Sequence, residues 1–186
     1  MSLEQILKEK PEKKELISKN LVELVKNCMK KDIINLDLVH TCLLQALEIS
    51  TTKDIEELVS LFKDQIHQLA HTKDGAHASC LILSYGTAKD RKAAVKAIRD
   101  IIPQMALDQY GHMILIVLCA VVDDTKLVSK SVLAELKSSW HDLIRDKWGR
   151  NVVLFLCREG NDPLLKECRD KSVNTRYLLE LTATHK

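Results

Sequence analysis

The chain has 186 residues, and its 28 lysines and arginines against 26 aspartates and glutamates leave a formal net charge of +2. This charge excludes a polybasic nucleic-acid-binding tail, so any anion-binding site has to come from local clustering. Aromatic residues make up only 4% of the chain, which also has five glycines and three prolines. Because aromatic sheet platforms and turn-rich β-sandwiches need more of these residues, we expect an all-α protein.

Apolar residues recur every three or four positions along most of the chain, which is the period of an amphipathic helix. This pattern predicts a series of long helices at 14–31, 53–70, 89–102 and 125–143, the last with a break near Ser138 and Ser139. Polar residues suited to capping precede three of these helices. They are Thr52 or Asp54 for a helix starting at Ile55, Thr87 for the helix from Lys89, and Asp123 or Asp124 for the segment from Thr125 to Leu136.

The segments that follow these helices are similar to one another. They are Asp37–Leu47, Thr72–Leu83, Asp108–Leu118 and Asp146–Leu156, which align on His40, Gly75, Gly111 and Gly149 at intervals of 35, 36 and 38 residues. The repeating unit is therefore a helix pair, and such pairs bury their apolar faces by stacking into an α-solenoid with an extended concave surface. We expect one domain over 1–186, with repeats at about 14–51, 52–87, 88–122 and 123–159 and a C-terminal helical cap or partial repeat at 160–186.

Features of membrane, secreted and disulfide-bonded proteins are missing from the sequence. The longest apolar run, Met113–Val122, is about half of the roughly 20 residues that a membrane-spanning helix needs. The first residues lack the apolar stretch and cleavage site of a secretory signal, so the chain is expected to stay inside the cell. No CxxC motif occurs, and we expect reduced, buried thiols at Cys28, Cys42, Cys80, Cys119, Cys157 and Cys168.

Catalytic and metal-binding motifs are also absent: the sequence has no GxSxG, Walker A or Rossmann glycine pattern. A zinc site from His67, His71, His77 and Cys80 is disfavoured, because there is no HExxH and the third ligand would have to lie across a turn. Asp123 and Asp124 are consecutive and do not converge on one atom, so helix capping explains them. We therefore expect no enzyme activity, no metal, no cofactor and no small-molecule substrate.

The pattern D-x-[YW]-G-x-x-[VI]-[VL] at Asp108–Leu115 and Asp146–Val153 resembles the repeat of the Pumilio (PUF) RNA-binding family. The strings at His71–Ile98, Tyr110–His112, Val122–Val128 and Asp146–Leu156 are similar to the Puf-A/penguin branch of nucleolar PUF-like proteins. This resemblance implies a right-handed α-solenoid of stacked PUF-like repeats. Since proteins of that branch are longer, the chain is expected to be a fragment of a longer protein.

The resemblance also implies which positions would read RNA, because three side chains after the glycine position of a PUF repeat contact one base. The corresponding triplets are Thr41, Cys42, Gln45; Ala76, His77, Cys80; His112, Met113, Ile116; and Arg150, Asn151, Leu154. Ala76, Ile116 and Leu154 offer no side-chain donor or acceptor, so three of the four repeats cannot make a two-pronged contact to a base edge. Lysine and arginine contacts to the phosphate backbone are the remaining route.

Two local clusters supply the cations for such contacts. Ser84–Arg99 carries a charge of +4 and Arg145–Arg150 a charge of +2. At the second cluster, free backbone N–H groups at the start of a helix are expected to favour phosphate as well. The candidate nucleic-acid-binding residues are Lys73, His77, Lys89, Arg91, Lys92, His112, Lys147, Arg150 and Asn151. Trp148 occupies the position of Tyr110 in the repeat and is expected to pack between repeats.

The resemblance implies a non-catalytic protein of the nucleus and nucleolus that binds RNA with little base specificity and acts in rRNA processing and ribosome biogenesis or in translational regulation. Single-stranded or duplex DNA and ribosome-assembly proteins are further expected partners, and a membrane is not. The alternative is an armadillo- or HEAT-like scaffold that binds a protein in the same groove. One groove lined by Lys73, His77, Lys147 and Arg150, with Arg91 or Lys92 at its edge, would favour RNA, and scattered positions would favour a protein partner.

Overall fold

A computed structural model describes residues 3–122 and 124–157 of the chain. All regular structure in these two ranges is helical, with no strand, which confirms the all-α prediction. None of the helices in these ranges is long and apolar enough to cross a lipid bilayer. The predicted cap or partial repeat at 160–186 and Cys168 lie outside the described residues.

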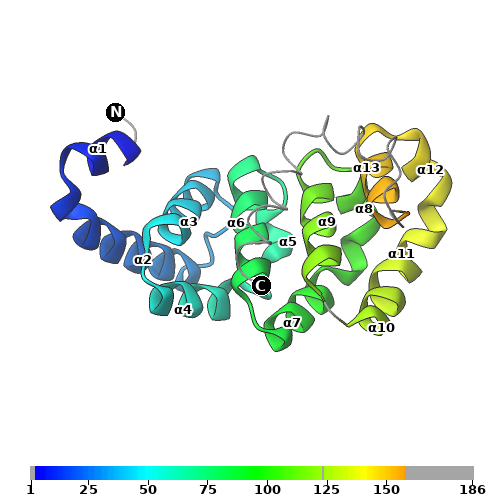
Figure 1. Ribbon diagram of the computed structural model, residues 1–186, viewed down its shortest axis with the longest axis horizontal. Coiled ribbons are helices and arrows are strands. Elements are labelled where there is room, and N and C mark those ends of the chain that lie inside the picture. Colours follow the sequence, from blue (N-terminus) through cyan, green and yellow to red (C-terminus); the bar gives the residue numbers. More distant parts are fainter. Residues whose placement is uncertain (1–2, 123, 158–186) are drawn as a thin grey trace.

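The helices follow one another as pairs along the long axis of the molecule (Figure 1). We call the first members of the pairs the first row and the second members the second row. The second row consists of α3 (Asp37–Ile49), α6 (Lys73–Tyr85), α9 (Gly111–Val121) and α13 (Lys147–Leu156). The first row consists of α2 (Lys14–Lys30), α4 (Thr52–Phe62), α5 (Ile66–Leu69), α7 (Ala88–Ile98), α8 (Ile102–Leu107) and the short turns α10 (Thr125–Val128), η3 (Ser129–Leu133), α11 (Ala134–Leu136), η4 (Lys137–Ser139) and α12 (Trp140–Arg145).

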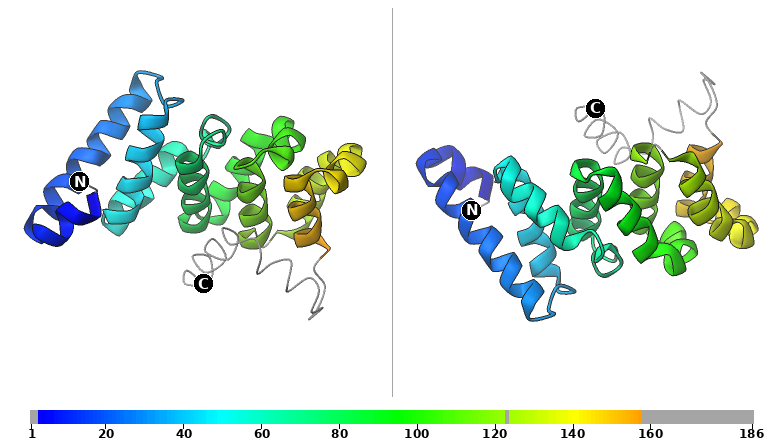
Figure 2. Two further views of the ribbon diagram at one scale, coloured as in Figure 1. Left: turned by 90° about the horizontal axis from the view of Figure 1, so that it is seen from above. Right: turned by 90° about the horizontal axis from the view of Figure 1, so that it is seen from below.

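Stacking of the second row holds successive pairs together. Helix α3 packs against α6, α6 against α9, and α9 against α13, and Figure 2 shows this succession from above and below. The short helices α1 (Leu3–Glu9) and η1 (Pro11–Lys13) precede the stack, and η2 (Arg99–Ile101) joins α7 to α8. Side chains of both rows, such as Phe62 and Leu81 or Ile98 and Val117, fill the buried core between pairs. The division into repeats at the boundaries given above stays a prediction.

Each second-row helix starts against the backbone of the segment that leads into it, and glycine makes this approach possible. A Cβ atom on Gly111 would lie 2.8 Å from the Met105 carbonyl oxygen, and one on Gly149 would lie 2.8 Å from the Leu143 carbonyl oxygen. Gly75 has the same relation to Leu69. All three carbonyls lie six residues before their glycine, which explains physically why the aligned repeats share this residue.

In the first pair, His40 stands at the glycine position. Its side chain, rather than a close backbone approach, makes the contact with the carbonyl six residues earlier. The Nε2 atom of His40 lies 2.8 Å from the carbonyl oxygen of Ile34, again six residues earlier, and therefore carries the proton and donates it. The Nδ1 atom then accepts from the Thr72 hydroxyl at 2.6 Å. His40 is fully buried, and this burial lowers its pKa. It therefore links the first pair to the second as a neutral ring.

The first row is more broken than the periodicity predicted. The helix expected at 53–70 is divided into α4 and α5, and the one expected at 89–102 ends at Ile98 and continues through η2 into α8. The break expected near Ser138 and Ser139 is confirmed, because η4 is a 3₁₀ turn there. Capping by Thr87 and Asp124 is also confirmed, whereas α4 is capped by Thr51 rather than by Thr52 or Asp54.

The cysteines within the described ranges are all free thiols, as expected. Cys80 is buried, and burial raises the pKa of its thiol well above the usual range. Burial likewise raises the pKa of Cys119 to about 12. The prediction that the thiols are buried is confirmed in full only at Cys80 among the described cysteines: Cys28, Cys42 and Cys119 are half-buried, and Cys157 at the end of α13 is exposed, where the prediction is wrong.

Candidate nucleic-acid interface

The first turns of the second-row helices α6, α9 and α13 are capped by side chains of the protein itself. Thr72 accepts from the Gly75 N–H at 3.0 Å. Asp108 accepts from the N–H groups of Tyr110 and Gly111, and Asp146 from those of Trp148 and Gly149, at 2.7–2.8 Å. The expectation that free N–H groups at the start of α13 favour phosphate is therefore wrong, because the Asp146 carboxylate already occupies them.

The N-terminal caps and first turns of the second-row helices together form one edge of the molecule, which we call the cap edge. The capping carboxylates add negative charge to this edge. The hydrogen bond from the Gly149 N–H is the largest of several effects that hold the pKa of Asp146 below its usual range, so the carboxylate is ionised. At the caps and first turns of the second row, three cations are outnumbered by four carboxylates. The cations are Lys73, Lys147 and Arg150, and the carboxylates are Asp37, Asp74, Asp108 and Asp146.

Four of the twelve base-reading positions implied by the resemblance are buried, two on α6 and two on α9. Ala76 and Cys80 on α6 and His112 and Ile116 on α9 are all at most 4% exposed. Thr41 on α3 is half-buried, and its hydroxyl donates to the Asp74 carboxylate at 2.7 Å. Among the four triplets, only Arg150 is exposed, next to the half-buried Asn151. A one-base-per-repeat reading surface is therefore missing from α6 and α9.

The candidate residue His112 belongs to the packing between α9 and α13. Its Nδ1–H donates to the Asp108 carbonyl oxygen at 3.0 Å, and burial lowers its pKa. Its ring centroid lies 5.1 Å from that of Trp148, and the Lys147 ammonium lies 4.2 Å from the Trp148 ring centroid. The expectation that Trp148 packs between repeats is therefore confirmed. The other candidate histidine, His77, is half-buried on α6, and burial lowers its pKa too.

Arg91 binds helix ends inside the protein. Its guanidinium donates to the carbonyl oxygens of Leu83 at 2.8 Å and Ser84 at 3.0 Å in the last turn of α6, and to that of Val121 at 2.8 Å at the end of α9. A cation at two helix C-termini is also favoured by the helix dipoles. Because these bonds use the guanidinium, Arg91 is not among the interface residues proposed below, although the sequence had placed it there.

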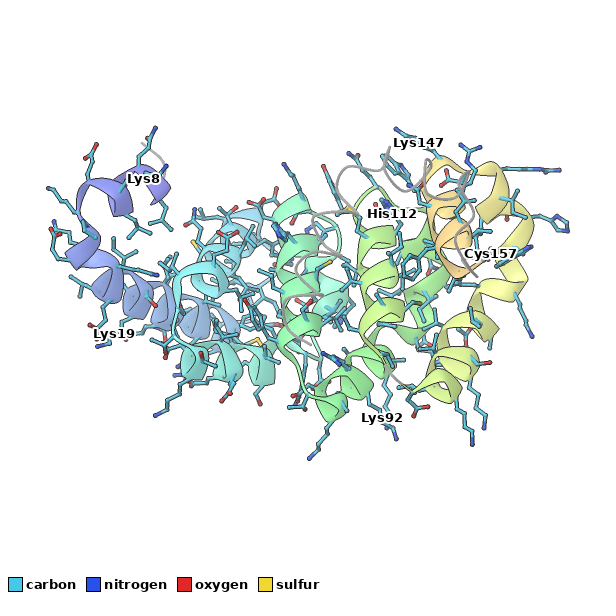
Figure 3. All side chains as sticks on the ribbon, viewed as in Figure 1. Lys8, Lys19, Lys92, His112, Lys147 and Cys157 are labelled. Atoms are coloured by element: carbon cyan, nitrogen blue, oxygen red, sulfur yellow. The ribbon has the colours of Figure 1, made fainter. Side chains whose placement is uncertain are left out.

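The remaining candidates divide between two edges of the molecule. Lys73, Lys147, Arg150 and Asn151 belong to the cap edge, whereas Lys89 and Lys92 are exposed on α7. Figure 3 shows Lys147 at the top and Lys92 at the bottom of the molecule. Between α6 and α13, helix α9 contributes the apolar Met113 and Ile116. The continuous basic groove that would have favoured RNA is therefore not formed, and by the same criterion the scattered positions count toward a protein partner.

A possible metal site lies at the junction of the first two pairs, where Asp37, His40 and His71 bring ligand atoms within 4.8 Å of one another. Both ring nitrogens of His40 are already hydrogen-bonded, to Ile34 and Thr72, so the ring has no lone pair for an ion. His67, His77 and Cys80 do not join this group. The geometry thus offers only Asp37 and His71 as ligands, both exposed.

Comparisons with known proteins connect this architecture to a family. No protein-family model matches the sequence. The chain is 35% identical over 155 residues to Pumilio domain-containing protein 12 of Caenorhabditis elegans and 34% identical over 156 residues to human Pumilio homolog 3. Each match covers 83% of the chain and 20% or 24% of the relative, so the chain spans about a fifth to a quarter of the length of these curated relatives.

Comparison of the fold with solved structures points to the same family. A crystal structure of human Puf-A in complex with DNA superimposes with a TM-score of 0.79 at 30% sequence identity, covering 99% of this chain and 40% of that one. This match confirms the predicted fold class, a right-handed α-solenoid of stacked PUF-like repeats. From the agreement of sequence, repeat geometry and fold, the chain belongs to the Pumilio repeat family and is similar to its Puf-A members.

Proposed function

We propose that the chain is a non-catalytic nucleic-acid-binding module that contacts the sugar–phosphate backbone and has little base preference. The observation that carries this proposal is the burial of Ala76, Cys80, His112 and Ile116, which removes base-edge contacts from α6 and α9. Backbone contacts need only lysine and arginine, and these do not discriminate sequences. The crystallised complex of human Puf-A with DNA supports nucleic acid as the ligand class.

Binding to labelled oligonucleotides by fluorescence anisotropy tests this proposal. The ligands are two single-stranded RNAs of unrelated sequence, a single-stranded DNA and a duplex DNA, each across a salt series. We expect dissociation constants within about tenfold of one another and a steep loss of affinity with salt, because counterion release dominates such binding. Absence of binding at low salt would contradict the proposal and favour the alternative of a protein-binding scaffold. A strong preference for one RNA would contradict the backbone mechanism.

We further propose a nuclear and nucleolar location and a role in rRNA processing and ribosome biogenesis or in translational regulation, with ribosome-assembly proteins as partners. The resemblance to the nucleolar PUF-like branch supports this proposal. Microscopy of the tagged chain together with crosslinking to RNA tests it. Enrichment of pre-ribosomal RNA in the crosslinked fraction is the expected result, and an even cytoplasmic distribution without such RNA would contradict the proposal.

A further inference from the structure

Helix α7 is fixed in orientation by two charged residues of its first turn, Asp90 and Arg91. Asp90 completes the capping box with Thr87 and forms an ion pair of 2.7 Å with Lys63, and Arg91 binds the C-terminal carbonyls of α6 and α9. Val95 and Ile98 are fully buried on the same side. The opposite side of the helix is therefore held toward solvent.

All of the charged residues on that outward side of α7 are lysines. Lys89, Lys92 and Lys96 are exposed and spaced by three and four residues, which places them along one face of the helix. No ion pair involves any of the three among the described residues. The single acid of α7, Asp90, is neutralised by Lys63 on the inner side.

The neighbouring first-row segment extends this row of positive charge. The turn η3 packs against α7, and Lys126 on α10 and Lys130 on η3 are exposed four residues apart. The acids close by in sequence are Asp123, Asp124, which caps α10, Asp100 in η2, and Glu135, which is paired with Arg99. The turn η3 is a π-helix, a rare form that is frequent at functional sites. We call Lys89, Lys92, Lys96, Lys126 and Lys130 the lysine stripe.

The lysine stripe differs in charge balance from two other charged surfaces of the molecule, α4 and the cap edge. In the same row, α4 exposes Lys53 together with Glu56 and Glu57, so this helix shows no positive excess. On the cap edge, three cations face four carboxylates. Near a polyanion, a surface on which carboxylates equal or outnumber the cations gains little attraction, whereas a surface with an excess of lysines attracts phosphates and releases counterions when it contacts them.

We propose that the lysine stripe on the first row, rather than the cap edge of the second row, is the surface that binds the phosphate backbone. This inference rests on the proposed function and assigns it a location. The stripe crosses from one helix pair to the next, so a single nucleic-acid strand can contact α7 and η3 together. Lys89 and Lys92 are among the candidates of the sequence analysis and Lys96 lies in its Ser84–Arg99 cluster, whereas Lys126 and Lys130 are not named there.

Three triple variants of the full chain, each losing three positive charges, test the location. Lys89→Gln/Lys92→Gln/Lys96→Gln removes the α7 part of the stripe, and Lys73→Gln/Lys147→Gln/Arg150→Gln removes the cations of the cap edge. The matched control is Lys14→Gln/Lys30→Gln/Lys53→Gln, which changes exposed lysines of α2 and α4 in the same row. Lys126→Gln/Lys130→Gln is a second stripe variant. Circular dichroism verifies that each variant is folded.

Affinity is measured with a fluorescein-labelled single-stranded RNA and a duplex DNA at about 0.1 M salt, where loss of three phosphate contacts should weaken binding at least about tenfold. We expect this loss for the α7 variant, a smaller loss for Lys126→Gln/Lys130→Gln, and less than about twofold for the control and cap-edge variants. Loss of affinity in the cap-edge variant alone would overturn the stripe and leave the proposed function standing.

Three further results would also overturn the inference. If the wild-type chain binds neither nucleic acid at low salt, the proposed function and the stripe both fail. If polyglutamate of matched charge binds the stripe more tightly than either nucleic acid, the surface is a docking site for an acidic protein segment. An equal loss of affinity in all three triple variants would show that only net charge matters and that the stripe is not a site.

Discussion

Arg91 joins the C-terminal ends of α6 and α9, so removing its guanidinium tests the stacking of the second row. Arg91→Met keeps the apolar stem and deletes the donors that reach Leu83, Ser84 and Val121. A hydrogen bond from a charged donor contributes about 1.5–3 kcal/mol, but carbonyls at this half-buried position regain part of that from water. We therefore expect the free energy of unfolding to fall by about 2–4 kcal/mol.

Urea unfolding followed by far-ultraviolet circular dichroism measures this difference. The matched control is Lys92→Met, which changes the next residue of α7 on its exposed side and should alter stability by less than about 0.5 kcal/mol. Arg91→Lys keeps the charge but reaches fewer carbonyls, so its loss should lie between the two. If Arg91→Met and Lys92→Met unfold at the same urea concentration, the structural role assigned to Arg91 is wrong.

Three other predictions concern the glycine, cap and histidine positions. Gly111→Ala places a Cβ 2.8 Å from the Met105 carbonyl oxygen and should destabilise the chain by about 1–3 kcal/mol in the same urea assay, and an unchanged midpoint would refute the close approach. Asp146→Ala removes the cap of α13 and should lower the free energy of unfolding by about 1 kcal/mol at neutral pH. The difference between wild type and variant should shrink as the pH falls below the usual carboxyl pKa toward the lowered pKa of Asp146, because the wild-type carboxylate then becomes protonated and loses its advantage as a cap. Because burial lowers the pKa of His40 and His112, the unfolded chain takes up protons first, so the melting temperature should be highest above about pH 6.5 and fall on acidification. A melting temperature that rises between about pH 7 and about pH 5 would contradict neutral, buried rings.

The repeat could be predicted from the sequence because its determinants are local. Gly75, Gly111 and Gly149 recur at a nearly constant interval, and each allows the helix start to lie close to the carbonyl oxygen six residues earlier. The cap at Thr87 was predictable for the same reason, because a capping box is formed by residues within four positions of one another. The caps of α9 and α13 were available by this reasoning as well, because Asp108 and Asp146 precede their glycines by three residues.

The parts that could not be predicted depend on contacts between distant segments. Nothing in the sequence near Arg91 reveals that its guanidinium reaches Val121, 30 residues away, so its charge suggested a phosphate contact instead. The role of His40 depends on Thr72, 32 residues away, for the same reason. The lysine stripe lies between these cases: the spacing of Lys89, Lys92 and Lys96 is visible in the sequence, but its continuation to Lys130 requires the packing of η3 against α7.

The dependence of nucleic-acid affinity on salt tests the central claim most directly. For single-stranded RNA, each contacted phosphate contributes about 0.7 to the slope of the logarithm of affinity against the logarithm of salt concentration. We predict the same slope for two RNAs of unrelated sequence and a slope shallower by about 2 for Lys89→Gln/Lys92→Gln/Lys96→Gln. A slope that this variant leaves unchanged, or affinities that differ strongly between the two RNAs, would contradict backbone binding through the lysine stripe.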